Sequence, residues 1–171
     1  MEDKGKAIRD AFEFLQQAFS ETSILLQMIE DAMAKAGLKC PNGSASVWDR
    51  SAAFYNPTGW MTPYVHRAYV DKQADGYEKG KVAVLTIQFA PSRWEYPILF
   101  FGVAKLRKKD PVWHSLRAHT FGEDSLAFAV DGSPDSWTTY PLESAEDPIA
   151  EIGYRVMPLV AVANATELQN E

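Results

Sequence analysis

The sequence lacks several features that mark common classes of protein. Its 171 residues include a single cysteine, Cys40, so no internal disulfide can form and a disulfide-rich secreted scaffold is excluded. The longest apolar run, residues 98–104, is far shorter than the roughly 20 residues that a membrane-spanning helix needs. The first residues have no apolar signal-peptide core. We therefore expect a cytoplasmic protein that has no membrane partner.

Motifs for common catalytic and cofactor sites are also missing. No glycine-rich loop of the Walker or dinucleotide-binding kind follows any predicted strand, and there is no Gly-x-Ser-x-Gly elbow. One cysteine cannot provide zinc-finger spacing. His114 and His119 are five residues apart, which points them in different directions on a helix or a strand. The sequence thus predicts no cofactor, no metal and no assigned catalytic residue.

Basic side chains are absent from one long stretch. Residues 118–154 hold eight acidic residues and no Lys or Arg, and the whole chain has a net charge of −6. Nucleic acid is therefore not an expected partner, because phosphate binding needs a basic face. The acidic stretch is either a solvated surface or a patch that meets a basic protein. A basic cluster at 105–109 could face it within the molecule or across a dimer.

The clearest pattern is a heptad repeat in the first third of the chain. Apolar or small residues recur at alternating spacings of four and three: Ile8, Phe12, Leu15, Phe19, Thr22, Leu26, Ile29, Met33 and Ala36. This seam predicts a helix over residues 6–36 that ends at Gly37. A helix of about 30 residues would be ~45 Å long.

Two arrangements of that helix remain open. It either lies across its own sheet or packs against a second copy of the chain. In the second arrangement the predicted homodimer interface consists of Phe12, Leu15, Phe19, Leu26, Ile29 and Met33. Phe14 and Ile24 are apolar but lie off the seam, which suggests that two faces of the helix need cover.

The rest of the chain reads mainly as strands. Segments 45–55, 64–70, 82–89, 98–106 and 126–130 have the β-branched, aromatic or alternating pattern of strands. Pro148 after Asp147 suggests a helix over 147–157, although the sequence leaves open whether 147–163 is helix or strand. The order predicts an α+β fold with a long N-terminal helix, an antiparallel sheet of about five strands and a shorter C-terminal helix. We expect one domain over 1–171, with the helix at 1–37, the sheet at 45–130, an acidic connection and C-terminal helix at 131–163, and a disordered tail at 164–171.

Aromatic and basic residues gather in the predicted loops. Trp, Tyr and Arg are the residue types that most often anchor interfaces. The candidate ligand-binding or partner-binding residues are Arg93, Trp94, Tyr96, Trp113, His114, Arg117 and Trp137. These aromatics either cap the edges of the core or form the rim of a pocket.

Three functions are compatible with these observations. The leading interpretation is a non-catalytic binding or regulatory module, dimeric through the N-terminal helix, that recognises a small ligand or a protein partner with its aromatic loops. The first alternative is a small enzyme acting on an anionic metabolite, with His66 or His114 as general acid or base and Arg67, Arg93 or Arg117 as the anion anchor. The second is an acidic partner subunit of the immunity, chaperone or secretion-associated kind.

Overall fold

The computed structural model has one long N-terminal helix and a six-stranded antiparallel sheet, which confirms the predicted α+β class. The chain divides into two compact units, Met1–Lys39 and Cys40–Glu171, and each is described by itself. The residues that the structure describes are 4–41, 64–74, 80–89, 95–107, 137–141 and 149–159. The expectation of a single domain stays a prediction.

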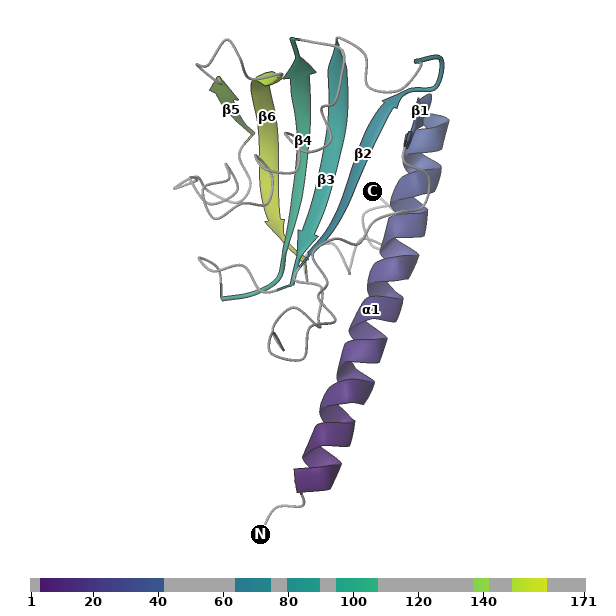
Figure 1. The fold of residues 1–171 in the computed structure, drawn as a ribbon, viewed down its shortest axis with the longest axis vertical. Coiled ribbons are helices and arrows are strands. Elements are labelled where there is room, and N and C mark those ends of the chain that lie inside the picture. The colour runs from purple at the N-terminus through teal and green to yellow at the C-terminus, as the bar shows by residue number, and fades with distance from the viewer. Residues whose placement is uncertain are drawn as a thin grey trace, which may run out of the picture. The chain divides into compact units, whose positions relative to one another are not determined.

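The N-terminal unit consists of helix α1 and a short strand. Helix α1 spans Lys4–Lys35, as the heptad pattern predicts, and strand β1 spans Leu38–Lys39 (Figure 1). Between them Gly37 has a φ of 82°, a left-handed conformation that glycine adopts without a Cβ clash and that commonly ends helices. The Thr22 hydroxyl donates to the Ala18 carbonyl at 2.8 Å, so this polar seam position is satisfied inside the helix.

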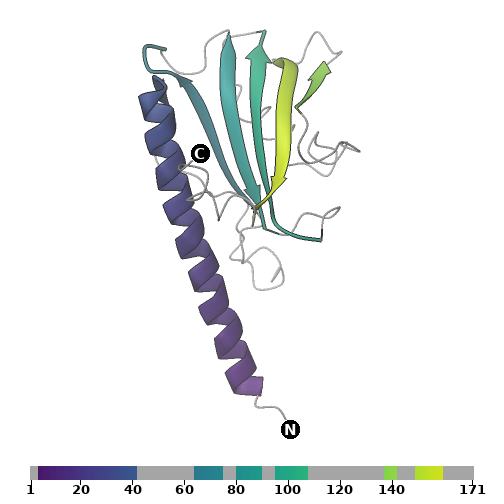
Figure 2. The same ribbon diagram turned by 180° about the vertical axis from the view of Figure 1, so that it is seen from behind.

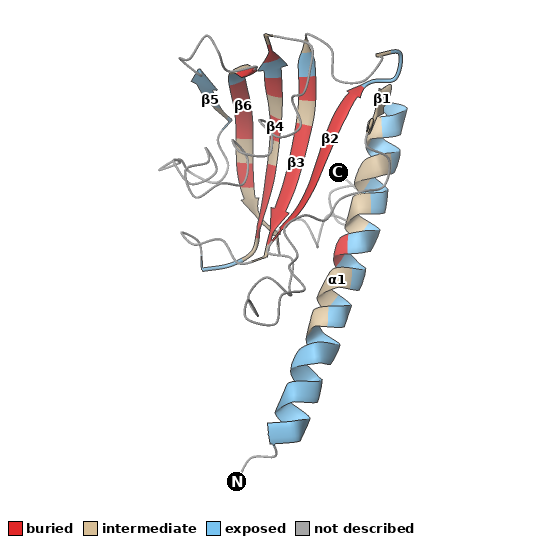
Figure 3. Ribbon diagram, viewed as in Figure 1, coloured by how far each residue is buried: buried red, intermediate tan, exposed pale blue. Residues whose placement is uncertain are grey.

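The seam of α1 is only partly covered. Thr22 is the one buried residue of the helix, and five of the six predicted interface residues are half-buried: Leu15, Phe19, Leu26, Ile29 and Met33. The sixth, Phe12, is 64% exposed, and Figure 3 shows that the N-terminal half of α1 is largely exposed. Phe14 and Ile24, off the seam, are also exposed.

The second unit is built on five strands that pair antiparallel throughout. Their bounds are β2 (Tyr64–Asp71), β3 (Lys81–Gln88), β4 (Ile98–Leu106), β5 (Thr138–Pro141) and β6 (Ile149–Pro158). They lie in the order β2-β3-β4-β6-β5, as both ribbon views show (Figures 1 and 2). The strands predicted at 64–70, 82–89 and 98–106 are confirmed, whereas those predicted at 45–55 and 126–130 lie outside the described residues.

The predicted helix over 147–157 is wrong for the described part of that segment, which forms β6. Strand β6 pairs with β4 from Ile98↔Pro158 to Leu106↔Ile149. Pro148 resembled a helix start, but the alternation of Ile152, Tyr154 and Val156 fits a strand with one buried face. The Arg107 side chain also donates to the Ile149 carbonyl at 3.0 Å, where the β4–β6 register shifts.

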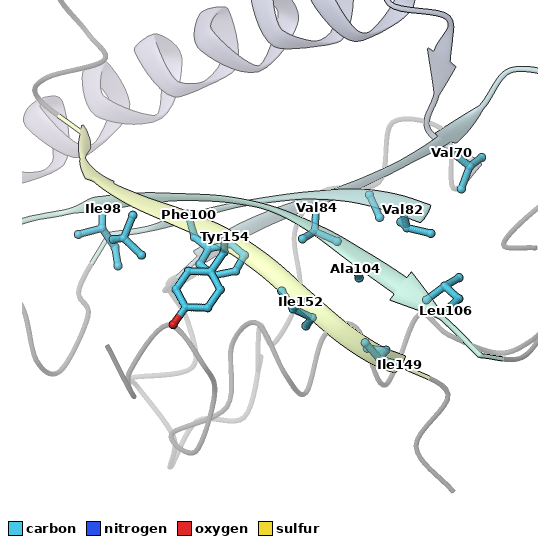
Figure 4. Packing of buried hydrophobic residues seen from close by; sticks show 12 residues of the cluster. Val70, Val82, Val84, Ile98, Phe100, Ala104, Leu106, Ile149, Ile152 and Tyr154 are labelled. Atoms are coloured by element: carbon cyan, nitrogen blue, oxygen red, sulfur yellow. The ribbon is translucent and has the colours of Figure 1, made fainter. Parts of the chain in front are cut away.

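One face of the sheet carries the main hydrophobic core. Its cluster comprises Ala68, Val70, Val82, Val84, Ile98, Phe100, Ala104, Leu106, Ile149, Ile152, Tyr154 and Val156. Figure 4 shows the labelled side chains of this cluster beside the strands. The rings of Phe100 and Tyr154 are stacked, with 5.1 Å between their centroids. A Cβ added at Gly102 would lie 2.8 Å from the Gly153 carbonyl oxygen, so the close packing of β4 and β6 depends on a glycine there.

Candidate functional site

The second face of the sheet carries an exposed tryptophan next to a glycine. Trp137 directly precedes β5 and is 51% exposed. A Cβ added at Gly153 in β6 would lie 2.7 Å from the indole Nε1, 2.8 Å from Cζ2 and 3.0 Å from Cε2. Nε1 and Cζ2 are nearer than Cε2, so the edge of the indole meets the glycine. The missing side chain of Gly153 therefore makes room for Trp137 to stand on the sheet.

Beside this indole is an open hollow of about 400 Å³. Four adjacent strands contribute to it, in the order β3, β4, β6 and β5. The lining residues are Lys81, Val103, Lys105, Trp137, Thr139, Glu151 and Gly153. The volume falls in the range of small-molecule sites, roughly 300–1,000 Å³. The apolar parts of the lining are Val103, Gly153 and the indole, and the polar parts are two lysines, one hydroxyl and one carboxylate.

The charged residues of the hollow form a row across three strands. Lys81 in β3 is the register partner of Lys105 in β4, and Lys105 is the partner of Glu151 in β6. All three side chains are exposed. None of them makes a salt bridge or a side-chain hydrogen bond with another described residue. Two cations thus face each other directly, an arrangement that destabilises a sheet.

A second set of polar residues lies on the core face, where the start of β2 pairs with the end of β3. The register pairs are Tyr64↔Gln88 and His66↔Thr86, and all four residues are buried. His66 Nδ1 lies 3.0 Å from the Thr86 hydroxyl oxygen. Among the described residues Gln88 Oε1 has no hydrogen-bond partner. Their burial means that the described part of the chain shows no exposed surface at which a ligand would meet them.

His66 and Arg67 do not share a site. They are consecutive residues of β2, so their side chains lie on opposite faces of the sheet. Arg67 is buried, and its guanidinium carbon lies 5.9 Å from the centroid of the Tyr69 ring, a cation–π contact along the strand. This pair therefore cannot act as acid–base group and anion anchor on one substrate.

The core face also holds one tyrosine with a perturbed pKa. Burial raises the pKa of Tyr154 above its ordinary value of 10.0, and Tyr140 adds a smaller Coulombic effect in the same direction. Tyr140 lies in β5, opposite Ile152 and two residues beyond the Thr138↔Tyr154 pair. At neutral pH Tyr154 is therefore a neutral phenol, and its ring packs against Phe100.

Two of the seven predicted binding residues lie within the described residues. Trp137 lines the hollow, whereas Tyr96, 37% exposed, precedes β4 and does not line it. The other five lie outside the described residues: Arg93, Trp94, Trp113, His114 and Arg117. Their convergence on one site stays a prediction.

Besides Lys105, five lining residues are not among the binding candidates from the sequence: Lys81, Val103, Thr139, Glu151 and Gly153. Lys105 was noted only as part of the basic cluster, and its register with Glu151 does bring one member of that cluster opposite the acidic stretch. The sequence signal for the two lysines was their position at the end of an apolar strand: Lys81 begins β3, and Lys105 is the second-last residue of β4. Whether two such lysines lie opposite each other depends on the strand register, which cannot be read from their spacing along the chain.

Comparisons add no family to this geometry. Within the described residues no cluster of three His, Cys, Asp or Glu side chains is placed to hold a metal ion, and no helix is long and apolar enough to cross a membrane. No family model matches the chain, and neither the curated proteins nor the solved structures contain a match to it.

Proposed function

We propose that this protein is a non-catalytic binding module whose recognition surface is the Trp137 face of the sheet. The observation that carries the proposal is the exposed indole held over Gly153 beside a hollow of about 400 Å³. A large aromatic side chain at an open hollow supplies contact area at low cost in conformational entropy. Without a bound molecule the exposed indole ring is in contact with water. A molecule bound in the hollow would make most of its apolar contact with this ring.

The proposal includes self-association through α1. Heptad spacing is typical of helices that pack on one another, and Phe12 on that seam is exposed. A homodimer that covers the seam would remove Phe12 from water. The binding surface lies on the sheet of the second unit, so each copy would carry its own hollow.

The enzyme alternative has less support in the described residues. His66 is fully buried and faces away from Arg67. The version with His114, Arg93 and Arg117 falls outside the described residues and stays a prediction. The acidic-subunit alternative likewise stays a prediction, because most of residues 118–154 lie outside the described residues.

The experiment is a two-dimensional NMR titration of the tryptophan indole N–H signals. The chain has five tryptophans, and Trp137→Phe identifies the signal of Trp137. The titrant is the fraction of a host-cell extract that contains only small molecules. We expect the Trp137 signal to shift saturably while the other four indole signals stay in place. A Trp137 signal that does not move, or five signals that drift together, would overturn the binding function at this surface.

A further inference from the structure

We infer that the hollow binds a small planar acid with a single negative charge, such as an aromatic carboxylate. This rests on the proposed function, since it names the ligand class of the same surface. In this arrangement the acid group lies between Lys81 and Lys105, and the aromatic ring lies against Trp137. Thr139, also in the lining, has a hydroxyl available to substituents on the ring.

The charge of the ligand follows from the lysine pair. Lys81 and Lys105 are directly opposite on neighbouring strands, which places their Cβ atoms about 4.5–5.5 Å apart. No described carboxylate lies within salt-bridge distance of either one. An anion between the two ammonium groups would turn this repulsion into two attractive, charge-assisted contacts. The flexible lysine stems allow both groups to reach one carboxylate.

Glu151 limits that charge to one. It is the register partner of Lys105, so it lies on the same face and in the same row as the two lysines. The three side chains together give a net charge of +1. A dianion would bring a second negative charge towards Glu151, which costs free energy. A monoanion balances the net charge of +1 of these three side chains. This argument favours a carboxylate over a phosphate.

The shape of the ligand follows from Trp137. The Trp137 indole stands on Gly153 in β6, whose register partner in β4 is Val103, two residues from Lys105. One strand across and two residues along separate Gly153 from Lys105 by roughly 8 Å, at about 4.8 Å per strand and about 3.3 Å per residue. The lining between the indole and Lys105 is Val103, which has no polar side-chain atom. An aromatic ring covers this apolar floor and meets the side of the indole, which stands with its edge on the glycine. A two-ring acid spans the distance from the indole to the lysine pair.

The experiment measures binding affinity by isothermal titration calorimetry with three probes, at neutral pH and low salt. 2-Naphthoate has the ring and the charge, 2-naphthamide has the ring alone, and inorganic phosphate has charge alone. We expect saturable binding of naphthoate, binding of naphthamide weaker by about tenfold or more, and no saturable binding of phosphate. Each tenfold step corresponds to about 1.4 kcal/mol.

Matched variants separate the contributions to naphthoate affinity. Lys81→Met and Lys105→Met keep the stem length and remove the charge, and each should weaken binding about three- to tenfold. Glu151→Gln should tighten binding about two- to fivefold, because it removes the opposing charge. Lys35→Met, at the exposed end of α1, makes the same change in net charge and should leave affinity unchanged. All four side chains are exposed, so circular dichroism should show intact folding.

The outcomes distinguish the ligand class from the binding function. Equal affinity for naphthoate and naphthamide, or equal effects of Lys81→Met and Lys35→Met, would overturn the charge assignment. Naphthoate affinity unchanged in Trp137→Ala would overturn the ring assignment. If no probe binds while the cell extract still shifts the Trp137 signal, the ligand class is wrong and the binding function stands. If neither binds, both are wrong.

Discussion

Helix α1 and strand β2 differ greatly in how much of their apolar pattern is buried. The helix has 32 residues and one buried residue, Thr22, whereas seven of the eight residues of β2 are buried. Helix α1 has a clear heptad repeat in the sequence, and β2 has the β-branched and aromatic composition of a strand. The difference teaches that a local sequence pattern predicts the type of an element, while burial depends on what packs against it. We therefore expect the stability of the chain to reside in the sheet.

The largest effect that tests this comparison comes from two phenylalanines. Phe100→Ala should lower the free energy of unfolding by about 3–5 kcal/mol, because the ring is fully buried and stacked on Tyr154. Phe14→Ala should change it by no more than about 0.5 kcal/mol, since that ring is 69% exposed. Urea unfolding followed by circular dichroism measures both. Similar losses in the two variants would mean that α1 is as tightly covered as the sheet.

A second pair of substitutions tests whether the α1 seam is an interface. Phe12→Asp places a charge on the exposed part of the seam, and it should weaken a homodimer by about tenfold or more, since a buried unpaired charge is costly. Phe14→Asp makes the same change at a similarly exposed position off the seam and should leave assembly unchanged. Light scattering over a range of concentrations gives the dissociation constant. A wild-type chain that stays monomeric throughout would remove the dimer from the proposal.

The smallest effect is a pH dependence confined to the sheet. The folded state raises the pKa of Tyr154, so it keeps a proton that the unfolded chain releases. This contribution to stability is fully present below about pH 10 and is lost as pH rises through the raised pKa. The free energy of unfolding should therefore fall as the pH rises above about 10, and it should fall less in Tyr154→Phe.

The control for this measurement is Tyr96→Phe, because Tyr96 lies outside the core cluster and is partly exposed. It should keep the alkaline slope of the wild-type protein. The same slope in all three proteins would show that the phenol of Tyr154 does not titrate with unfolding.

The elements with strong local signals were predictable. The heptad seam and Gly37 predicted α1 to within two residues at its start, and the strand predicted at 98–106 matches β4. Periodicity reports local geometry, so it works where one face is consistently apolar. The helix predicted over 147–157 was wrong because it rested on Pro148, which is equally compatible with a first helical turn and with the start of a strand. Only the pairing of β6 with β4 decides between the two.

The candidate site was predictable only in one residue. The sequence alone named Trp137 among the candidate binding residues, and it established the α+β class and the absence of common cofactor motifs. The tertiary structure decided the rest: that Gly153 makes room for the indole, that Lys81 meets Lys105, and that Glu151 completes the row. These residues come from strands far apart in the chain. Strand register brings them together, and register follows from the packing of the whole sheet rather than from any local pattern.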